Sequence, residues 1–335
     1  MLTLGIETSC DETAVALVED GFAIRANLIA SQVDLHERFG GVVPEVAARA
    51  HVEALNPLLE QALEQTGASF GDVDGVACTV GPGLVGALLV GMAGAKAMTL
   101  ATGAPFVGVN HLEGHIWANF LEHGPPEPPY VALVVSGGHT MLVYMPERHR
   151  YELLGQTLDD AAGEAFDKVA RLMGLGFPGG PALDVAAQSG DPHAIAFPRA
   201  MADSGDFDFS LSGVKTAVLR YVKAERAAGR DIEMNDLAAS FQEAVVDVQV
   251  KKTIAAARER DVSTVLLGGG VVANTRLRSR MSADGGIAGI RVLYPSLGLC
   301  TDNAAMIACV GAARLAAGER TSLDIGADPN LRLSS

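Results

Sequence analysis

The chain has 335 residues, of which 49% are hydrophobic and 19% charged, so it is long enough for two domains and apolar enough to fill their cores. Its formal net charge of −15 excludes nucleic-acid binding through a broad positive surface. The four cysteines form no C-x-x-C pair, which indicates reduced thiols rather than a disulfide framework. No basic segment precedes an apolar run at the N-terminus, so the sequence predicts a cytoplasmic protein.

Two segments share one pattern. Residues 3–18 predict two strands around a polar turn at 8–13, and residues 131–144 predict two strands around the turn 136–140. Helices and further strands follow each hairpin, which predicts a duplicated α/β fold of two lobes with a cleft between them. We expect an N-terminal lobe at 1–108, a C-terminal lobe with the metal and adenylate sites at 109–325, and a tail at 326–335. An alternative for the last helix is that it packs back on the N-terminal lobe.

The stretch from Val76 to Ala95 carries no charge and is long enough to span a bilayer. Gly81-Pro82-Gly83 interrupts it, however. We therefore expect a buried strand at 75–80, a tight turn, and a small-residue helix at about 84–100 in the core of an α/β protein.

A pair of histidines, His111 and His115, follows the strand-like run 105–109. On a helix, residues four apart share a face, so the two imidazoles can bind one transition metal. In zinc proteases of the H-E-x-x-H type, the general-base Glu directly follows the first His. Here that position is Leu112, and Glu113 comes one place later, turned by about 100° on the helix. The spacing favours a metal site and disfavours a protease.

A third ligand is needed, and a carboxylate is the usual one. Asp302 is the candidate, between a strand ending near Tyr294 and a helix starting near Asn303. Its alternative role is to cap that helix. Two His and one Asp form the facial set that suits Fe(II), and Zn(II) is also possible.

Glycine-rich turns occur at 136–138, 179–181 and 268–270. Such turns let backbone N–H groups approach phosphates, helped by the N-terminus of the following helix, so three of them indicate a nucleotide or adenylate pocket. The sequence contains neither a P-loop nor a G-x-G-x-x-G fingerprint. Asp167 and Asp184 lie near these turns and are candidates to accept hydrogen bonds from a ribose, although a solvated helix charge explains each of them as well.

Eight segments together resemble the bacterial TsaD family of tRNA N6-adenosine threonylcarbamoyltransferases over nearly the whole chain. These segments are 5–13 (GIETSCDET), 40–45 (GGVVPE), 81–84 (GPGL), 111–115 (HLEGH), 135–140 (VSGGHT), 159–168 (DDAAGEAFDK), 177–181 (FPGGP) and 268–271 (GGGV). The resemblance implies the actin-like, Hsp70-like sugar-kinase fold, also called ASKHA, in which two duplicated α/β lobes surround a nucleotide cleft. It also implies transfer of the threonylcarbamoyl group from threonylcarbamoyl-AMP to N6 of adenosine 37 in tRNAs reading ANN codons, which forms t6A.

The resemblance further implies the residues of the sites. His111, His115 and Asp302 would bind one Fe(II) per subunit, with Zn possible. The adenylate would be bound by Val134, Val135, Ser136, Gly137, Gly138, Asp167, Gly180, Asp184 and Asn274. No catalytic acid or base is assigned, although Asp11 and Glu12 in the first hairpin turn could orient the amine or accept its proton.

The partners implied by the resemblance are tRNA and the accessory proteins TsaB and TsaE, with no membrane. For an acidic chain, tRNA binding requires accessory subunits or a local basic rim such as Arg276, Arg278 and Arg280. Two other functions stay open. One is a small-molecule kinase of the same fold, although such kinases commonly have Asp where this chain has Glu7, and the other is a non-enzymatic nucleotide-binding partner. A metallo-endopeptidase is disfavoured.

Overall fold

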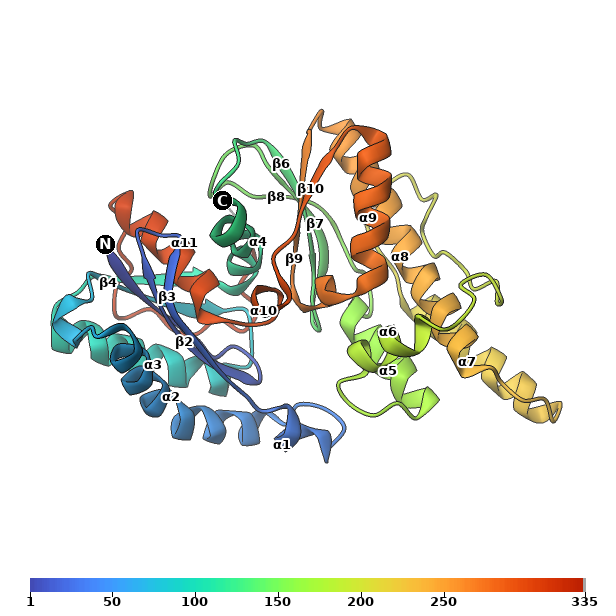
Figure 1. Cartoon of the computed structure of the whole chain (residues 1–335), viewed down its shortest axis with the longest axis horizontal. Helices are drawn as coiled ribbons and strands as arrows, with labels where there is room; N and C mark the ends of the chain where they lie inside the picture. The colour runs from blue at the N-terminus through green and yellow to red at the C-terminus, as the bar shows by residue number, and fades with distance from the viewer. Residues whose placement is uncertain (334–335) are drawn as a thin grey trace. The chain divides into compact units, whose positions relative to one another are not determined.

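The computed structural model describes residues 1–333 and divides into two compact units (Figure 1). Unit 1 comprises Met1–Pro126 and Pro295–Leu333, and unit 2 comprises Glu127–Tyr294. This division differs from the expected boundary after residue 108. The chain first leaves unit 1 within the proline-rich segment 125–129 and returns to it after Tyr294. The reason is that the helix bearing both histidines packs against the last helix of the chain, which also belongs to unit 1.

Unit 1 is built on a five-stranded mixed sheet with the order β3-β2-β1-β4-β5. The pairs β1–β2 and β2–β3 are antiparallel, and β1–β4 and β4–β5 are parallel. Its elements are β1 (Leu2–Glu7), β2 (Glu12–Glu19), β3 (Ala23–Ser31), α1 (Val33–Glu37), α2 (Pro44–Thr66), η1 (Phe70–Asp72), β4 (Gly75–Gly81), α3 (Val85–Thr102), β5 (Phe106–Asn110), α4 (His111–His123), α10 (Leu297–Cys300) and α11 (Ala304–Ala316).

Unit 2 repeats this plan with a sheet ordered β8-β7-β6-β9-β10. Again the first two pairs are antiparallel and the last two parallel, so the predicted duplication and the two predicted hairpins are confirmed. Its elements are β6 (Tyr130–Val135), β7 (Thr140–Met145), β8 (Glu152–Gln156), α5 (Ala162–Met173), α6 (Gly179–Ala187), α7 (Ser212–Ala227), α8 (Met234–Glu259), β9 (Thr264–Gly268), η2 (Gly270–Ala273), α9 (Thr275–Ala288) and β10 (Arg291–Leu293).

Helix α11 lies unusually close to the sheet of unit 1. A Cβ added to Gly5 of β1 would overlap the carbonyl oxygen of Ala304, and a Cβ added to Gly311 of α11 would overlap Ala77 of β4. Small residues on both partners therefore let the helix backbone approach the strands, which larger side chains would prevent. This packing fixes the start of α11 and the loop before it, where Asp302 lies.

The C-terminal segment after α11 also packs on unit 1, although the sequence suggested a separate tail at 326–335. Asp328 N–H donates to Val80 O over 2.9 Å, and the side chain of Asn110 donates to Arg332 O over 3.1 Å. Gly81, at φ +155°, leaves the space that Asp328 O occupies. The segment thus supports the ends of β4 and β5, and residues 334–335 lie outside the described part of the chain.

Helix α3 is buried on one side only. It is long and apolar enough to cross a membrane by length and composition, and 28% of it is buried; one such helix is weak support for a span. Leu88, Met92 and Ala95 are buried in unit 1, as expected for a core helix. Val85, Leu89 and Leu100 are instead more than half exposed, at 53%, 53% and 75%. The expectation of a core helix is therefore confirmed for one face, and the other face is an exposed apolar stripe.

Candidate functional site

Helix α4 begins at His111 because Asn110 caps it. The Asn110 side chain accepts a hydrogen bond from Leu112 N–H over 2.9 Å, immediately after β5 ends. His111 and His115 then lie one turn apart on the same face, with ring centroids separated by 4.5 Å and planes at 77°. Both are buried, so the structure places the predicted pair where a single ion would contact both rings.

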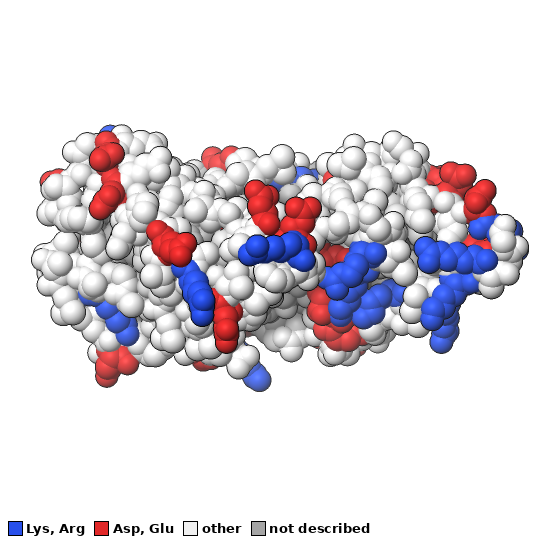
Figure 2. All heavy atoms as spheres, turned by 90° about the horizontal axis from the view of Figure 1, so that it is seen from below, with Lys and Arg blue, Asp and Glu red and all other residues white. Residues whose placement is uncertain are grey.

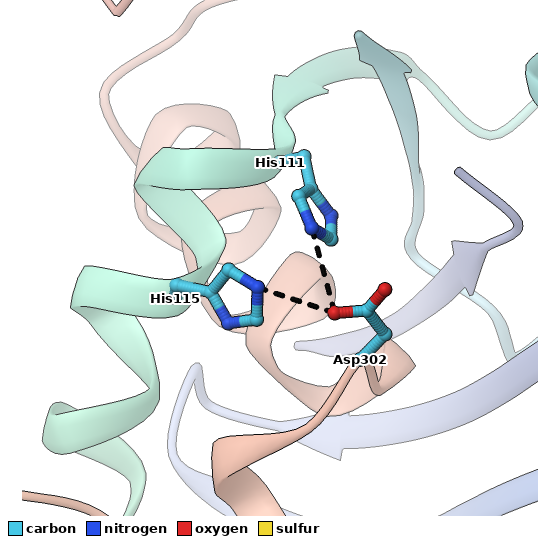
Figure 3. Close-up of side chains that lie close together, drawn as sticks. All are labelled: His111, His115 and Asp302. Carbon is cyan, nitrogen blue, oxygen red and sulfur yellow. Dashed lines mark ion pairs between the residues drawn. The ribbon is translucent and has the colours of Figure 1, made fainter. Parts of the chain in front are cut away.

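Asp302 completes the cluster from the loop between α10 and α11 (Figure 3). Its Oδ1 lies 3.5 Å from Nε2 of His111 and 3.2 Å from Nε2 of His115. The helix cap is its neighbour Asn303, whose side chain accepts from Met306 N–H over 3.0 Å. The alternative role of Asp302 as the cap of α11 is thereby excluded.

The donor set fits a metal ion. One ligand atom from each of the three residues lies within 4.8 Å of the others. Both ring nitrogens of His115 are buried and make no hydrogen bond within residues 1–333, although Nε2 is within ion-pairing distance of Asp302. A buried imidazole without hydrogen bonds is costly unless another partner, such as a cation, coordinates it. Two imidazoles and one carboxylate suit Fe(II) or Zn(II).

Glu7, at the end of β1, orients His111. The side chain is fully buried, and its Oε2 lies 3.0 Å from Nδ1 of His111. It also accepts hydrogen bonds of 2.5 Å from Thr79 Oγ1 and from Ser9 N–H. Because an ionised carboxylate only accepts, Nδ1 of His111 donates to Glu7 in both the neutral and the protonated ring, and Nε2 faces Asp302. No local pattern in the sequence indicates this role, and Glu7 stands out there only as a departure from the kinase pattern.

The charges in this cluster shift the pKa values in opposite directions. Burial lowers the pKa of His111, but the carboxylates of Asp302 and Glu7 outweigh it and raise the pKa to about 9. Burial and the neighbouring His111 lower the pKa of His115. Burial would raise the pKa of Asp302, but the two histidines lower it to about 2. At neutral pH Asp302 is therefore ionised and His111 protonated, so a metal ion competes with one proton.

The first hairpin turn places two further carboxylates near the cluster. Burial, followed by the charges of Asp302 and Asp11, raises the pKa of Glu12 to about 9. Ser31 Oγ donates to Glu12 over 3.3 Å. Since the charge of Asp302 contributes to this shift, a cation beside Asp302 would favour the ionised form of Glu12.

Glu113 points away from the histidine cluster. Its carboxylate is fully buried and lies 2.6 Å from a guanidinium nitrogen of Arg314 on α11. A charge buried in such a pair is unavailable as the general base of a metallopeptidase. The structure therefore also disfavours a protease.

In unit 2 the predicted adenylate residues are linked through contacts that form a ring, which begins at the glycine turn after β6. Gly163 N–H of α5 donates to Ser136 O over 3.2 Å, and Gly163 lacks the Cβ that would crowd Gly137. On the same helix, Asp167 accepts from Gly179 N–H over 2.8 Å, next to Gly180 at the start of α6.

The other half of the ring runs through Asp184 and Asn274. Asn274 Nδ2 donates to Asp184 Oδ1 over 3.1 Å, and the Asn274 side chain caps α9 by accepting from Leu277 N–H over 2.9 Å. Gly269, at φ +99°, lies against Val135, and this contact returns the ring to the strand that carries Val134. All nine predicted residues thus lie in unit 2, whereas the three metal candidates lie in unit 1.

A pocket of about 360 Å³ adjoins this ring in unit 2. Its walls come from α6, α8 and α9 and include Gln242 and Thr275, which also hydrogen-bond to Asn274 and Asp184 respectively. Gln242 is not predictable from the sequence, because a polar residue inside a long helix carries no local signal of its partners.

The three arginines of α9 that were expected to form a basic rim interact with groups of unit 2 itself. Arg276 and Arg280 pair with the buried carboxylate of Glu243, and the guanidinium of Arg278 donates to Val272 O over 2.6 Å. These side chains are therefore committed to structure in unit 2.

Comparisons with known proteins agree with these observations. The family described as TsaD, tRNA N6-adenosine threonylcarbamoyltransferase, matches residues 23–309. A relative of that name from Symbiobacterium thermophilum is 55% identical over 332 residues, covering 99% of this chain and 97% of the relative. One from Clostridium botulinum (strain 657 / Type Ba4) is 51% identical over 330 residues, covering 98% and 97%.

Solved structures show the same fold at low identity. The crystal structure of T. kodakarensis HypF matches with a TM-score of 0.64 and 14% identity, covering 94% of this chain and 48% of that chain. Component A of the Acidaminococcus fermentans (R)-2-hydroxyglutaryl-CoA dehydratase matches with a TM-score of 0.56 and 15% identity, covering 94% and 99%. Together with the two repeated sheets, these matches assign the ASKHA fold.

Proposed function

Because the chain belongs to the tRNA N6-adenosine threonylcarbamoyltransferase family, and is thus a transferase that acts on tRNA, we propose the reaction in detail. The chain transfers the threonylcarbamoyl group from threonylcarbamoyl-AMP to N6 of adenosine 37 in tRNAs reading ANN codons. The N6 amine attacks the carbamoyl carbon, the bond from that carbon to the phosphate oxygen breaks, AMP leaves, and the amine loses one proton. One observation supports the proposal above all. Unit 1 contains a cluster of His111, His115 and Asp302 that suits a metal, and unit 2 contains a ring of contacts whose glycine turns suit a phosphate.

The donor's AMP moiety belongs to unit 2 in this proposal. A Cβ at Gly137 or Gly138 would meet nothing within 4 Å, so the backbone N–H groups of this turn are open to a phosphate. The N-termini of α5 and α6 add the positive ends of their helix dipoles to the same ring. We assign Asp167 and Asp184 to the ribose hydroxyls and the adjoining pocket to the adenine.

His111, His115 and Asp302 would bind the metal, which we propose to be one Fe(II), with Zn(II) as the alternative. When bound, the ion supplies Lewis acidity toward a carbonyl oxygen. The chain's own residues do the rest: Glu7 fixes the tautomer and orientation of His111, and Asp11 and Glu12 are the candidates to orient the amine and accept its proton.

A small-molecule kinase of the same fold is the second function considered. Such an enzyme has no use for the buried His111–His115–Asp302 cluster, and the family match does not favour it. The same cluster disfavours a purely nucleotide-binding partner, because such a protein needs no metal ligands.

We also propose a cytoplasmic enzyme that works with the accessory proteins TsaB and TsaE. The support from the structure is the exposed apolar stripe of α3, formed by Val85, Leu89 and Leu100, which a protein partner such as TsaB would cover.

The test is reconstitution of the full chain with tRNA, threonylcarbamoyl-AMP and the accessory proteins, with transfer followed by mass spectrometry of the nucleosides. We expect t6A with the native chain and at least about a 100-fold loss for the double variant His111→Ala/Asp302→Ala, together with loss of bound metal. His123→Ala, on the same helix outside the cluster, is the matched control. Unchanged activity of the double variant would exclude a role for the metal, and absence of t6A with the native chain would exclude the function.

A further inference from the structure

The charge of this acidic chain is unevenly divided between the two units. Unit 1 contains 7 Lys and Arg against 19 Asp and Glu, whereas unit 2 contains 18 against 21. A polyanion is therefore repelled much less by unit 2 than by unit 1. The larger number of cations in unit 2 makes a local concentration of them there the first candidate for a surface that attracts a polyanion.

One segment of unit 2 has such a concentration. Residues 212–230, which form α7 and the turn after it, contain five cations and a single carboxylate, Glu225. That carboxylate is held by Arg230 in a two-pronged pair of 2.5 and 2.6 Å, and Lys215 pairs with Asp160. The local balance is thus strongly positive in a chain whose overall charge is −15.

The three remaining cations, Arg220, Lys223 and Arg226, recur every third residue along α7 and are exposed. Within residues 1–333 none of them lies within ion-pairing distance of a carboxylate. Figure 2 shows Lys and Arg side chains gathered at the end of the view where Figure 1 places the end of α7. Their charge is therefore available to an external ligand, unlike that of Arg276 and Arg280 on α9.

The opposite side of α7 anchors this row to the body of unit 2. Val214, Val218 and Val222 are buried, and Tyr221 packs edge-to-face on Phe197 with centroids 6.1 Å apart. The helix therefore presents Arg220, Lys223 and Arg226 from a packed backbone, so no backbone segment has to become ordered when a ligand binds them.

We propose that this row, the α7 basic row of Arg220, Lys223 and Arg226, binds the phosphate backbone of the tRNA substrate. The inference rests on the proposed function, because it takes tRNA as the polyanion. Charge complementarity identifies the ligand: three unpaired cations spaced along one helix match successive phosphates, and phosphate contacts position a nucleic acid without reading its sequence. The row thereby positions tRNA and takes no part in the chemistry.

The test measures tRNA binding by the full chain with its accessory proteins as a function of salt. Each phosphate contact contributes about 0.7–0.9 to the slope of log K against log salt. The triple variant Arg220→Gln/Lys223→Gln/Arg226→Gln should therefore reduce the slope by about 2 to 3 and weaken binding at least about tenfold at 0.1 M salt. The single variant Arg220→Gln should reduce the slope by about 1.

The matched control is Arg150→Gln/Lys251→Gln/Arg291→Gln, which removes the same charge from exposed positions of unit 2 outside α7. The proposal predicts a much smaller change in slope for this control. Equal slopes for the native chain and the α7 variant would overturn it, as would equal losses for the α7 variant and the control. If the α7 variant no longer binds an accessory protein but still binds tRNA, the α7 basic row would instead be a binding surface for an acidic protein. Native-chain t6A formation, measured in parallel, separates failure of this row from failure of the proposed function.

Discussion

The hairpins that open the two sheets have the same strand pairing but offer a ligand different atoms. In unit 1 the turn presents polar and charged side chains. Glu7 and Ser9 contact His111, and Asp11 and Glu12 follow them in the chain. In unit 2 the corresponding turn is Ser136-Gly137-Gly138, with open space where Cβ atoms would be. The two copies share one backbone plan, but one presents side chains of the kind that suit a cation and the other an open backbone turn of the kind that suits an anion.

The first test of this comparison is the pH dependence of metal binding to unit 1. Because the pKa of His111 is raised to about 9, a proton occupies it at pH 7 and competes with the ion. The apparent affinity for Zn(II) or Co(II) should rise about tenfold per pH unit from 7 and level off near 9, roughly 100-fold in total. Competition with a chelator of known pH dependence measures it. Nucleotide binding to unit 2 is the internal control and should not follow this profile; a metal affinity independent of pH in this range would contradict the assignment.

The second test separates Glu7 from the ligands themselves. Glu7→Gln keeps the shape of the side chain but removes the charge that orients His111, so metal affinity should fall about 10- to 100-fold. The pH at which affinity levels off should also move down, because the charge of Glu7 is one cause of the raised pKa of His111. Thermal unfolding of the metal-free variant checks the fold. A merely structural role for Glu7 would lower stability and leave the pH profile in place.

The third test concerns the glycine turns of unit 2 and uses two chemically identical changes. Gly137→Ala adds a methyl group into open space, so the fold should be kept while AMP affinity falls about tenfold, as the methyl group blocks the approach of a phosphate. Gly269→Ala is the matched contrast. Its φ of +99° and its contact with Val135 O should make the fold less stable by about 1–3 kcal/mol. Calorimetry and chemical denaturation distinguish the two, and equal AMP affinity of Gly137→Ala and the native chain would argue against a phosphate at this turn.

The sequence predicted those features that local patterns encode. Both hairpins, the strand and helix on either side of Gly81-Pro82-Gly83, and the shared face of His111 and His115 follow from periodicity and turn residues. Asp302 is predicted because a metal bound by two His needs a further ligand, which is usually a carboxylate. The structure places its Oδ1 3.2 Å from Nε2 of His115.

Features that depend on contacts between distant residues were not predictable in this way. The partner of Glu7 is 104 residues away, and the packing of α4 on α11 that moves the unit boundary joins segments nearly 200 residues apart. The arginines of α9 were expected to form an exposed rim, and only the fold shows Glu243 between two of them. A helical charge pattern gives the direction of a side chain but not the element that faces it.

The return of the chain to unit 1 has a consequence for its synthesis. Unit 2 is one continuous stretch, whereas unit 1 lacks α10, α11 and the segment that contacts β4 and β5 until unit 2 has been translated. On a ribosome, unit 2 therefore has all of its residues while Asp302 is still absent. The His111–His115–Asp302 cluster can form only after unit 2 has been translated, so a chain truncated before Asp302 keeps the nine predicted adenylate residues and lacks one predicted metal ligand.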